Sequence, residues 1–426
     1  MKIKKLISML TAFACSVVLT VPLSAMAYDP CDVDHDGQVN ILDVITINRH
    51  LAGTYFISNY NQLDANQNLI VDSADAQCVM NKIVGNSYSA KFYSREASGT
   101  GEIDFPSISG TTTLDDAASS TASRQYVKYT YGSMPSSYTG NYLNSYLTTY
   151  SLTPAFDTLT TSNNTRGQIF GGDSIVPATN SPENTGIVRI NHAVEYFDDD
   201  DNPRIVNSMS TGFIVGNHTI ATAAHCVYTG YKTGIYNNTT HIYEHTKERF
   251  YTPTITTYNS DGSASTTTLT PVEVHISANY RAGHTSQYDY ALITVEEDLS
   301  NYVHFSLGNS YNVTGTNFNH VPIYVTGAQY VNSHHLLYTD EGNVYTSSNG
   351  TVFKYVTSTA GGESGSPVYT ITKQTFNGTD SYVYTALAVH SGAGTYAGNS
   401  TYYYNQGPRI TNYLIKFYLG NPNISY

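Results

Sequence analysis

The serine at position 364 stands between glycines in the stretch G-E-S-G-S-P, residues 362 to 367. A short Gly/Ser/Pro stretch is usually a plain turn, so a nucleophilic serine also needs a base and an orienting carboxylate elsewhere in the chain. His225, in T-A-A-H-C, and Asp289, at the head of Y-D-Y-A-L-I-T-V, supply both. A serine hydroxyl is a poor nucleophile, so His225 would accept its proton while Asp289 orients the imidazole and stabilises its cation. These residue types predict acyl transfer through a serine nucleophile.

The elements expected around these residues would bring them together. Residues 211–226 form an apolar, β-branched stretch ending in small residues, which places His225 at a strand-to-loop junction. Glycines at 362 and 365 let the next loop turn tightly, so that the amides of Gly362 and Ser364 form an oxyanion hole. T-A-A-H-C resembles the base motif of chymotrypsin-fold proteases, and the order His, Asp, Ser is that of the same fold. The resemblance implies a mainly β protein, a double antiparallel β-barrel with the catalytic groups in the cleft between barrels.

Three later stretches narrow this resemblance. S-T-A-G-G-E-S-G-S-P, T-A-L-A-V-H-S-G-A-G and N-Q-G-P-R-I-T look like the bacterial glutamyl endopeptidases, secreted enzymes that cut after glutamate. The resemblance covers roughly residues 167–420. It implies that Thr359 and His390 bind the P1 carboxylate, because a hydroxyl donor and an imidazole that can become cationic suit that group. Ser391 and Gly392 would then line the backbone edge of the pocket.

The chain departs from related proteases at several positions. Ser358 stands six residues before the nucleophile, where a trypsin-like pocket would need an acidic residue. Glu363 replaces a frequent neutral amide, and Cys226 has no cysteine partner near Ser210. An acid at this position pairs with a new amino terminus in animal trypsin-like zymogens, so cleavage near Arg166 would activate this chain and release it from the residues before the cut. The competing hypothesis is that the intact chain is active.

Two stretches near the N-terminus, residues 32–43 and 64–75, share the spacing of a calcium loop. They read D-V-D-H-D-G-Q-V-N-I-L-D and D-A-N-Q-N-L-I-V-D-S-A-D, with oxygen-bearing side chains at loop positions 1, 3, 5, 9 and 12. Calcium takes six to eight hard oxygen ligands, which alternating Asp and Asn in a tight loop provide. An apolar stretch of helical period follows each loop, so the repeat predicts two calcium loops with one helix after each.

This pair of loops, with Asp rather than Glu at position 12, resembles a type I dockerin over residues 30–86. The resemblance implies calcium as cofactor and docking onto cohesin modules of a cellulosome-like scaffold. Leu69 stands where the second loop needs glycine, so we expect weaker calcium binding there. Loop positions 10 and 11 help to choose the cohesin; they are Ile-Leu in one loop and Ser-Ala in the other, which argues against two equivalent binding modes. The implied ligands are Asp32, Asp34, Asp36, Asn40 and Asp43 with the Gln38 carbonyl, and Asp64, Asn66, Asn68, Asp72 and Asp75 with the Ile70 carbonyl.

The first 27 residues predict a secretory signal, with a positive start, an apolar core and a small-residue cleavage site. Removing its three lysines takes the formal net charge from −13 to −16, which argues against nucleic-acid binding. No later segment approaches membrane-spanning length, so we expect a soluble extracellular protein. We divide the mature chain into a calcium module at 28–87, a linker or propeptide at 88–166, and a protease domain at 167–426.

Two alternatives stay open for the function. The chain is a serine protease of another P1 specificity, or a catalytically silent, scaffold-bound module that binds proteins. The stretch H-I-Y-E-H at 241–245 fits a zinc peptidase signature, but a surface loop is the better interpretation. Cys31 and Cys78 flank the two calcium loops and can pair with each other, which would leave Cys226 free.

Overall fold

The computed structural model covers the 426-residue chain and describes most of it between residues 29 and 411. The predicted secretory signal and Arg166 lie outside the described residues. Among the helices that are described, none is long and apolar enough to cross a membrane. The described residues are 29–51, 62–95, 101–106, 126–132, 168–169, 175–197, 202–228, 236–237, 242–243, 248–283, 285–329, 336–345, 351–396, 399–411 and 414.

The first of two large sheets is antiparallel and carries the candidate base and its carboxylate partner. Its core-facing β-branched residues include Val274 and Ile293, which are fully buried, as suits a pleated sheet with one face on a core. Ala291 lies opposite Thr222, so this pairing brings the residues before His225 beside the residues after Asp289. The strands in spatial order are β12 (Ala264–Leu269), β11 (Glu248–Tyr258), β6 (Ile187–Phe197), β7 (Pro203–Gly216), β8 (Thr219–Thr222), β14 (Ala291–Val295), β13 (Pro271–Ser277) and β3 (Tyr126–Thr130).

The second sheet holds the candidate nucleophile in the loop between two of its strands, β18 and β19. Its longest hairpin, β19–β20, turns at Asn377 and Gly378, whose φ values of 46° and 82° match a two-residue turn of the type that suits twisted strands. The strands of its main path, in spatial order, are β15 (Ser306–Leu307), β20 (Thr379–Val389), β19 (Pro367–Phe376), β16 (Ile323–Ala328), β17 (Leu337–Val344), β18 (Val352–Val356), β22 (Asn399–Pro408) and β21 (Gly392–Tyr396). Four short strands lie off this path: β1 (Tyr88–Tyr93) pairs with β19, β2 (Glu102–Ile103) with β1, β4 (Gln168–Ile169) with β22, and β5 (Val176–Pro177) with β17.

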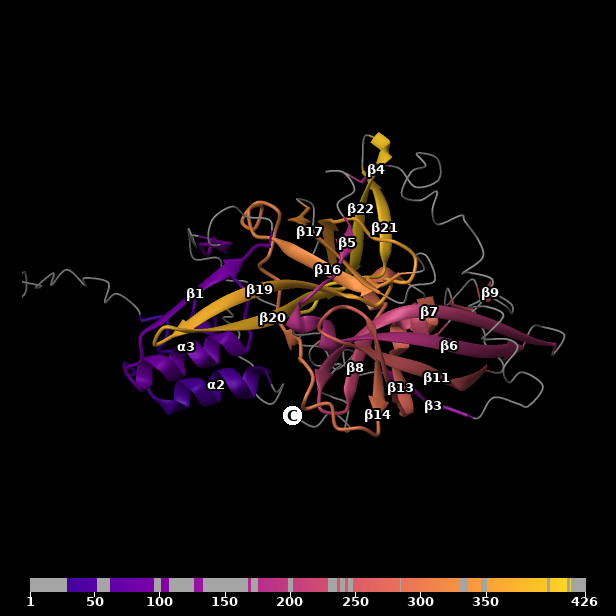
Figure 1. Cartoon of the computed structure of the whole chain (residues 1–426), viewed down its shortest axis with the longest axis horizontal. Coiled ribbons are helices and arrows are strands. Elements are labelled where there is room, and N and C mark those ends of the chain that lie inside the picture. Colours follow the sequence, from indigo (N-terminus) through magenta and orange to yellow (C-terminus); the bar gives the residue numbers. More distant parts are fainter. Residues whose placement is uncertain are drawn as a thin grey trace, which may run out of the picture.

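The architecture is mainly β and chymotrypsin-like, as the sequence predicts, with a small helical module at its N-terminal end (Figure 1). Short elements complete the described part of the fold. They are α5 (Ala224–Val227), α6 (Ala278–Gly283), the 3-10 turns η3 (Pro182–Gly186) and η4 (Ser286–Tyr288), and the hairpin β9 (Tyr236–Asn237) with β10 (Ile242–Tyr243).

The helical module consists of two halves, each a loop with the spacing predicted for calcium ligands followed by one helix. These helices are α2 (Ile41–Leu51) and α3 (Ser73–Ile83). Asp72 caps the start of α3, and the Asp75 side chain bonds back to the cap backbone, which satisfies amides that a helix start leaves unpaired. The module has its own apolar core, which contains Val33, Val44, Ile47, Leu63, Val71 and Val79.

Parts of the stretch 88–166 belong to the sheets. β1 pairs with β19 from Tyr88 opposite Phe376 to Phe92 opposite Thr372, and β3 pairs with β13. Phe92 is completely buried in the core of the second sheet. Of the two structures expected for this stretch, a loose spacer does not describe residues 88–92 and 126–130, because these residues pair with the protease strands β19 and β13.

Candidate active site and calcium loops

His225 and Asp289 form the best-defined pair in the candidate site. The carboxylate of Asp289 accepts two hydrogen bonds from the same residue: the His225 backbone N–H reaches Oδ1 at 2.8 Å, and Nδ1 reaches Oδ2 at 2.7 Å. The backbone bond fixes the start of α5 relative to the carboxylate. The ring bond then fixes the proton on Nδ1, and Nε2, the other ring nitrogen, lies 3.7 Å from Cys226 Sγ.

The charges of this pair stabilise each other. Burial raises the pKa of Asp289, but the charge of His225 and the hydrogen bonds of His225 and Ser391 outweigh it and hold that pKa below the usual value. Desolvation lowers the pKa of His225, whereas the charge of Asp289 raises it, and the net pKa lies well above the usual value. The His225 side chain keeps 33% of its surface exposed, while that of Asp289 keeps 5%. The carboxylate is therefore sequestered and the imidazole stays accessible.

Ser391 supplies a contact that the sequence did not predict. Its hydroxyl donates to Asp289 Oδ2, the oxygen that also accepts from the His225 ring. The sequence-based prediction placed Ser391 at the backbone edge of a substrate pocket, and its amide does bond the Gln406 carbonyl of β22, at 3.1 Å. The residue thus links the Asp289 carboxylate to β22.

Ser364 is positioned by the backbone of its own loop. The Ser364 carbonyl accepts from the Thr211 amide on β7 at 2.9 Å, and the Gly365 amide donates to the His390 carbonyl at 2.8 Å. Gly365 has a φ of +87°, and a Cβ there would lie 2.1 Å from the Thr211 carbonyl oxygen and 2.3 Å from Thr222 Oγ1. Only glycine permits this approach. Because Thr222 lies three residues before His225, the nucleophile loop is seated against the segment that carries the base.

The candidate oxyanion hole lies in the same loop. Gly362 has a φ of +103°, and a Cβ there would lie 2.6 Å from the Ala328 carbonyl oxygen, so this glycine is required for the same reason. The Gly362 carbonyl accepts from Thr211 Oγ1 at 2.8 Å, which turns the carbonyl toward the first sheet. The amides of Gly362 and Ser364 remain the predicted oxyanion donors.

Glu363, between these two residues, is fully buried. Its two carboxylate oxygens accept from Gln329 Nε2 at 2.9 Å and from the Ala360 amide at 2.7 Å. Burial raises the pKa of Glu363 to about 8, against the lowering effect of these two bonds. Burial therefore favours the neutral form of this carboxyl group.

The predicted P1 residues Thr359 and His390 have partners on neighbouring strands. Thr359 Oγ1 donates to Asn405 Oδ1 at 3.2 Å, and Asn405 Nδ2 donates to the Thr357 carbonyl at 2.6 Å. His390 Nδ1 lies within hydrogen-bond distance of the Tyr355 hydroxyl, which comes from β18. Tyr355 and Asn405 are positioning residues that sequence reasoning missed, because they contact the predicted pair only after β18 and β22 are paired.

The predicted Gly392 is the first residue of β21. It lies opposite Gln406 of β22, and a Cβ built on it would meet no heavy atom within 4 Å. Open space therefore borders Gly392.

In the first calcium loop, the carboxylates of Asp32, Asp34 and Asp36 place ligand oxygens within 4.8 Å of one another. Asp32 Oδ2 accepts from the Gly37 amide at 3.0 Å, which closes the turn at the position where glycine is required. The Asp43 carboxylate is buried at the other side of the loop and accepts backbone amides, including that of Asn40 at 2.8 Å. Hard oxygen donors converging from both sides fit a calcium ion.

The second loop repeats this arrangement. Asp64 Oδ2 accepts from the Leu69 amide at 2.9 Å, and the Asp75 carboxylate accepts from the amides of Asn66 at 3.1 Å and Asp72 at 2.9 Å. Burial raises the pKa of Asp64 to about 7 and raises those of Asp72 and Asp75. Several buried carboxylates with few cationic neighbours also fit a divalent cation, which would favour their ionised forms. Asn68 Oδ1 accepts from the Ile70 amide at 2.8 Å.

The chain thus combines a mainly β, chymotrypsin-like fold with a hydrogen-bonded His225–Asp289 pair, a serine loop seated against the strand before His225, and a helical module of two acidic loops. Residues 210–376 match the trypsin-like peptidase domain, and residues 30–84 match the dockerin type I domain. The chain therefore carries a trypsin-like peptidase domain behind a dockerin type I domain, which confirms the resemblances found in its sequence.

Known proteins show the same likeness. A glutamyl endopeptidase of Bacillus licheniformis is 28% identical over 201 residues, which are 47% of this chain and 55% of that protein. The chain thus spans about half the length of this curated relative. Two solved structures are similar. A Glu endopeptidase in complex with MPD has 20% sequence identity and a TM-score of 0.39, and the match covers 59% of this chain and 97% of that one. The thermostable serine protease AL20 of an extremophilic microorganism has 15% sequence identity and a TM-score of 0.35, and the match covers 55% of this chain and 97% of that one.

Proposed function

We propose that this chain is a secreted serine endopeptidase that uses His225, Asp289 and Ser364. The observation that carries the proposal is the pair of hydrogen bonds that fix His225 on buried Asp289, with the Ser364 loop seated on the strands beside them. His225 Nε2 would take the proton from the Ser364 hydroxyl during attack on the peptide carbonyl and return it to the leaving amine. Asp289 would stabilise the imidazolium formed in between.

The amides of Gly362 and Ser364 would stabilise the oxyanion of the tetrahedral intermediate. Removing one donor from such a site typically lowers kcat by about 100- to 1,000-fold. The bond from Thr211 to the Gly362 carbonyl supports this role, because it fixes the Gly362–Glu363 peptide plane, which lies between the two donor amides. A preorganised donor needs no reorientation as charge develops.

Glutamate at P1 is the specificity that the pocket favours. A substrate carboxylate would bind between the Thr359 hydroxyl and the His390 ring. Tyr355 supports this role: where its hydroxyl donates to Nδ1, the neutral ring carries its proton on Nε2 and can donate to a carboxylate. Asn405 would hold the Thr359 hydroxyl in place.

The decisive experiment incubates the mature-length protein with an unrelated protein and maps every new peptide terminus by mass spectrometry. Ser364→Ala is the test variant, and Ser366→Ala, in the same loop, is the matched control. Cuts after Glu with wild type and Ser366→Ala, but not with Ser364→Ala, support both the mechanism and the pocket. Cuts after other residues would keep the mechanism and contradict the glutamate preference. Absence of cutting would favour the protein-binding alternative.

The P1 pocket has its own test. With matched peptides ending in Glu or Gln, His390→Ala and Thr359→Ala should lower the Glu/Gln ratio of kcat/KM by about 10- to 100-fold, because each removes a hydrogen bond to a charged group. Unchanged ratios would contradict the assignment of both residues.

For the N-terminal module we propose calcium binding and docking to a cohesin of an extracellular scaffold. The donor sets of both loops support calcium. Ile41, Leu42 and Ile45 support docking, because they form an exposed apolar face on α2 with 49%, 51% and 43% of their surfaces accessible. Titration with calcium by calorimetry tests the loops: two sites are expected, the second weaker, and absence of heat would contradict the assignment.

A further inference from the structure

The second half of the calcium module is joined to the second protease sheet by polar contacts. Thr385 Oγ1 on β20 donates to Asp72 Oδ2 at 2.6 Å, and the hydroxyls of Ser73 and Ser306 lie 2.9 Å apart. The Asn309 amide donates to the Val71 carbonyl at 3.2 Å. These bonds link the start of α3 to β15 and β20, and Figure 1 shows the module lying against this end of the sheet.

Apolar contacts reinforce this junction. Ile70 of the second loop is buried in the same cluster as Val313 and Phe318 of the protease. The fit is close, because a Cβ on Gly308 would lie 2.7 Å from Ile70 Cγ2. The second calcium loop therefore belongs to the protease core as well as to its own module.

The residues after the module continue the contact as a strand. β1 is antiparallel to β19 over five residue pairs, from Tyr88–Phe376 to Phe92–Thr372. The Phe92 ring packs edge-on against Phe318 at a centroid distance of 5.2 Å. Backbone pairing and a buried aromatic side chain hold this strand in register.

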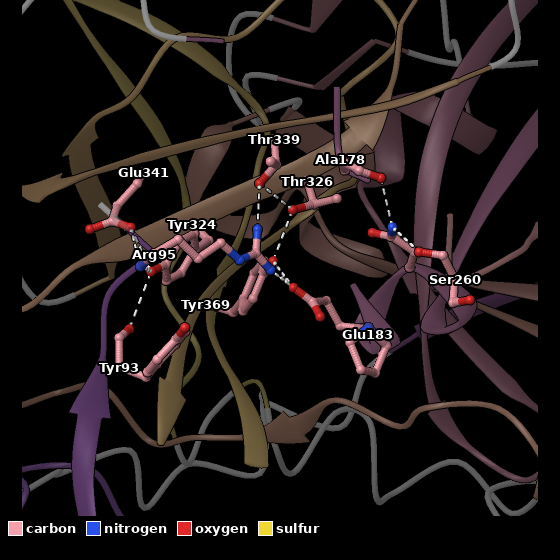
Figure 2. A network of polar contacts seen from close by, with 12 residues as sticks. Tyr93, Arg95, Ala178, Glu183, Ser260, Tyr324, Thr326, Thr339, Glu341 and Tyr369 are labelled. Carbon is pink, nitrogen blue, oxygen red and sulfur yellow. Dashed lines mark hydrogen bonds and ion pairs between the residues drawn. The ribbon is translucent and has the colours of Figure 1, made fainter. Parts of the chain in front are cut away.

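Arg95, two residues beyond β1, contacts groups from both halves of the protease fold (Figure 2). Its guanidinium forms an ion pair with Glu183 of η3, whose side chain is only 2% exposed. Its amide donates to Glu341 Oε2 of β17 and to the Tyr324 hydroxyl of β16, both at 2.9 Å, and its guanidinium carbon lies 4.9 Å from the centre of the Tyr324 ring.

Among the contacts described, Arg95 is the one positively charged partner of the Glu183 carboxylate. Glu183 also accepts from the Tyr369 hydroxyl of β19 at 3.2 Å, and Tyr369 and Thr326 share a bond of 2.9 Å. Removing the arginine would leave a buried carboxylate served only by neutral donors, which is strongly unfavourable. Arg95 thus joins η3, before the first sheet, to β16, β17 and β19 of the second.

We propose that residues 69–95 and 101–106 are a non-covalent clamp on the protease, anchored by Arg95, so that cutting the chain near Arg166 does not release the calcium module. This inference does not require the chain to be proteolytically active. Under this proposal, cleavage near Arg166 yields two chains that stay bound to each other, and the protease is not released. In the second half, Ser73 at loop position 10 bonds Ser306 and Ala74 at position 11 is fully buried, whereas Ile41 and Leu42 at the same positions of the first half are exposed.

The test uses full-length Ser364→Ala protein with the recognition site of a site-specific protease inserted after Arg166. After complete cutting, both fragments should co-elute in size-exclusion chromatography under native conditions and separate in denaturing urea. Separate elution at micromolar concentration under native conditions would overturn the proposal.

Two variants in the same background test the anchor. Arg95→Met should raise the dissociation constant of the cut fragments at least tenfold, because it removes the positive charge that pairs with buried Glu183. Lys91→Met is the matched control, since its ion pairs with Glu102 and Asp104 are exposed, and it should leave association unchanged. If the cut fragments of Arg95→Met and of Lys91→Met associate equally tightly, the role of Arg95 is overturned.

Hydrogen exchange keeps the proposal testable if Arg95→Met fails to fold. In cut protein that carries no further substitution, the β1 amides from Ser89 to Phe92 should exchange as slowly as in uncut protein. Fast exchange of these amides after cutting would mean that the clamp opens once the chain is broken, and would overturn the proposal.

Discussion

Glu363→Gln should stabilise the protein at alkaline pH and not at acid pH. In the folded chain the Glu363 carboxyl is fully buried among neutral donors, and its pKa is raised by burial from 4.5 to about 8. In the unfolded chain it titrates near its ordinary value. The amide of Gln has the same shape, can accept from Ala360 and can donate to Gln329 after rotation of that side chain, and never ionises.

The sign and size follow from proton linkage. Between pH 4.5 and 8 the folded chain holds a proton on Glu363 that the unfolded chain has lost, so wild-type stability falls as pH rises. One pH unit costs about 1.4 kcal/mol, and the full interval costs on the order of 5 kcal/mol. The difference in unfolding free energy between Glu363→Gln and wild type should therefore be near zero at pH 5 and grow by roughly 4 kcal/mol by pH 8.

Urea unfolding at several pH values, followed by tyrosine fluorescence, measures this difference. Both proteins carry Ser364→Ala to prevent self-digestion, and the chain has 39 Tyr and no Trp to report unfolding. Glu297→Gln is the control: hydrogen bonds of Thr270 overcome the effect of burial and lower the pKa of Glu297, so its effect should be flat between pH 5 and 8. A Glu363→Gln gain that is constant or shrinks with pH would refute the reasoning.

Three further predictions concern the site and the calcium module. Ser391→Ala removes a bond that stabilises ionised Asp289, so kcat/KM should fall about tenfold, with unchanged KM, in peptide assays. Cys31 and Cys78 have sulfur atoms 4.0 Å apart across 47 residues, so protein from an oxidising host should contain this disulfide, seen by intact mass, and lose about 4 kcal/mol on its reduction. Chelation of calcium should lower the unfolding free energy by about 3 kcal/mol when the ion had been present at a hundred times its Kd, as thermal melts with and without EGTA will show.

The sequence predicted those parts of the molecule whose chemistry is local. T-A-A-H-C and G-E-S-G-S-P each fix a backbone turn and a reactive side chain within six residues, so their order along the chain was enough to predict the class of fold. The calcium loops were predictable for the same reason, because one loop supplies nearly all the ligands of one ion. The helix after each loop was predictable because apolar residues recur there at the spacing of a helix.

Contacts between strands distant in sequence were not predictable. Tyr355 supports His390 from 35 residues away, and Arg95 meets Glu341 across 246 residues. Neither residue stands in a pattern that distinguishes it from other Tyr or Arg side chains. Residues 88–95 were interpreted as a linker or a propeptide because their Ser- and Tyr-rich composition hides the pairing of β1, whose partner strand lies almost three hundred residues later.

Leu69 departs from the calcium-loop motif, and the reason is a contact with a part of the protein outside the loop. In the second calcium loop it adopts a φ of +72°, and its amide bonds Asp64 as the Gly37 amide bonds Asp32 in the first loop. This backbone conformation costs a non-glycine residue about 1–2 kcal/mol. The Leu69 side chain packs against the core of the second protease sheet, a contact that glycine cannot make and that offsets such a cost. The loop therefore keeps the geometry of a calcium site while its sixth residue holds the module on the protease.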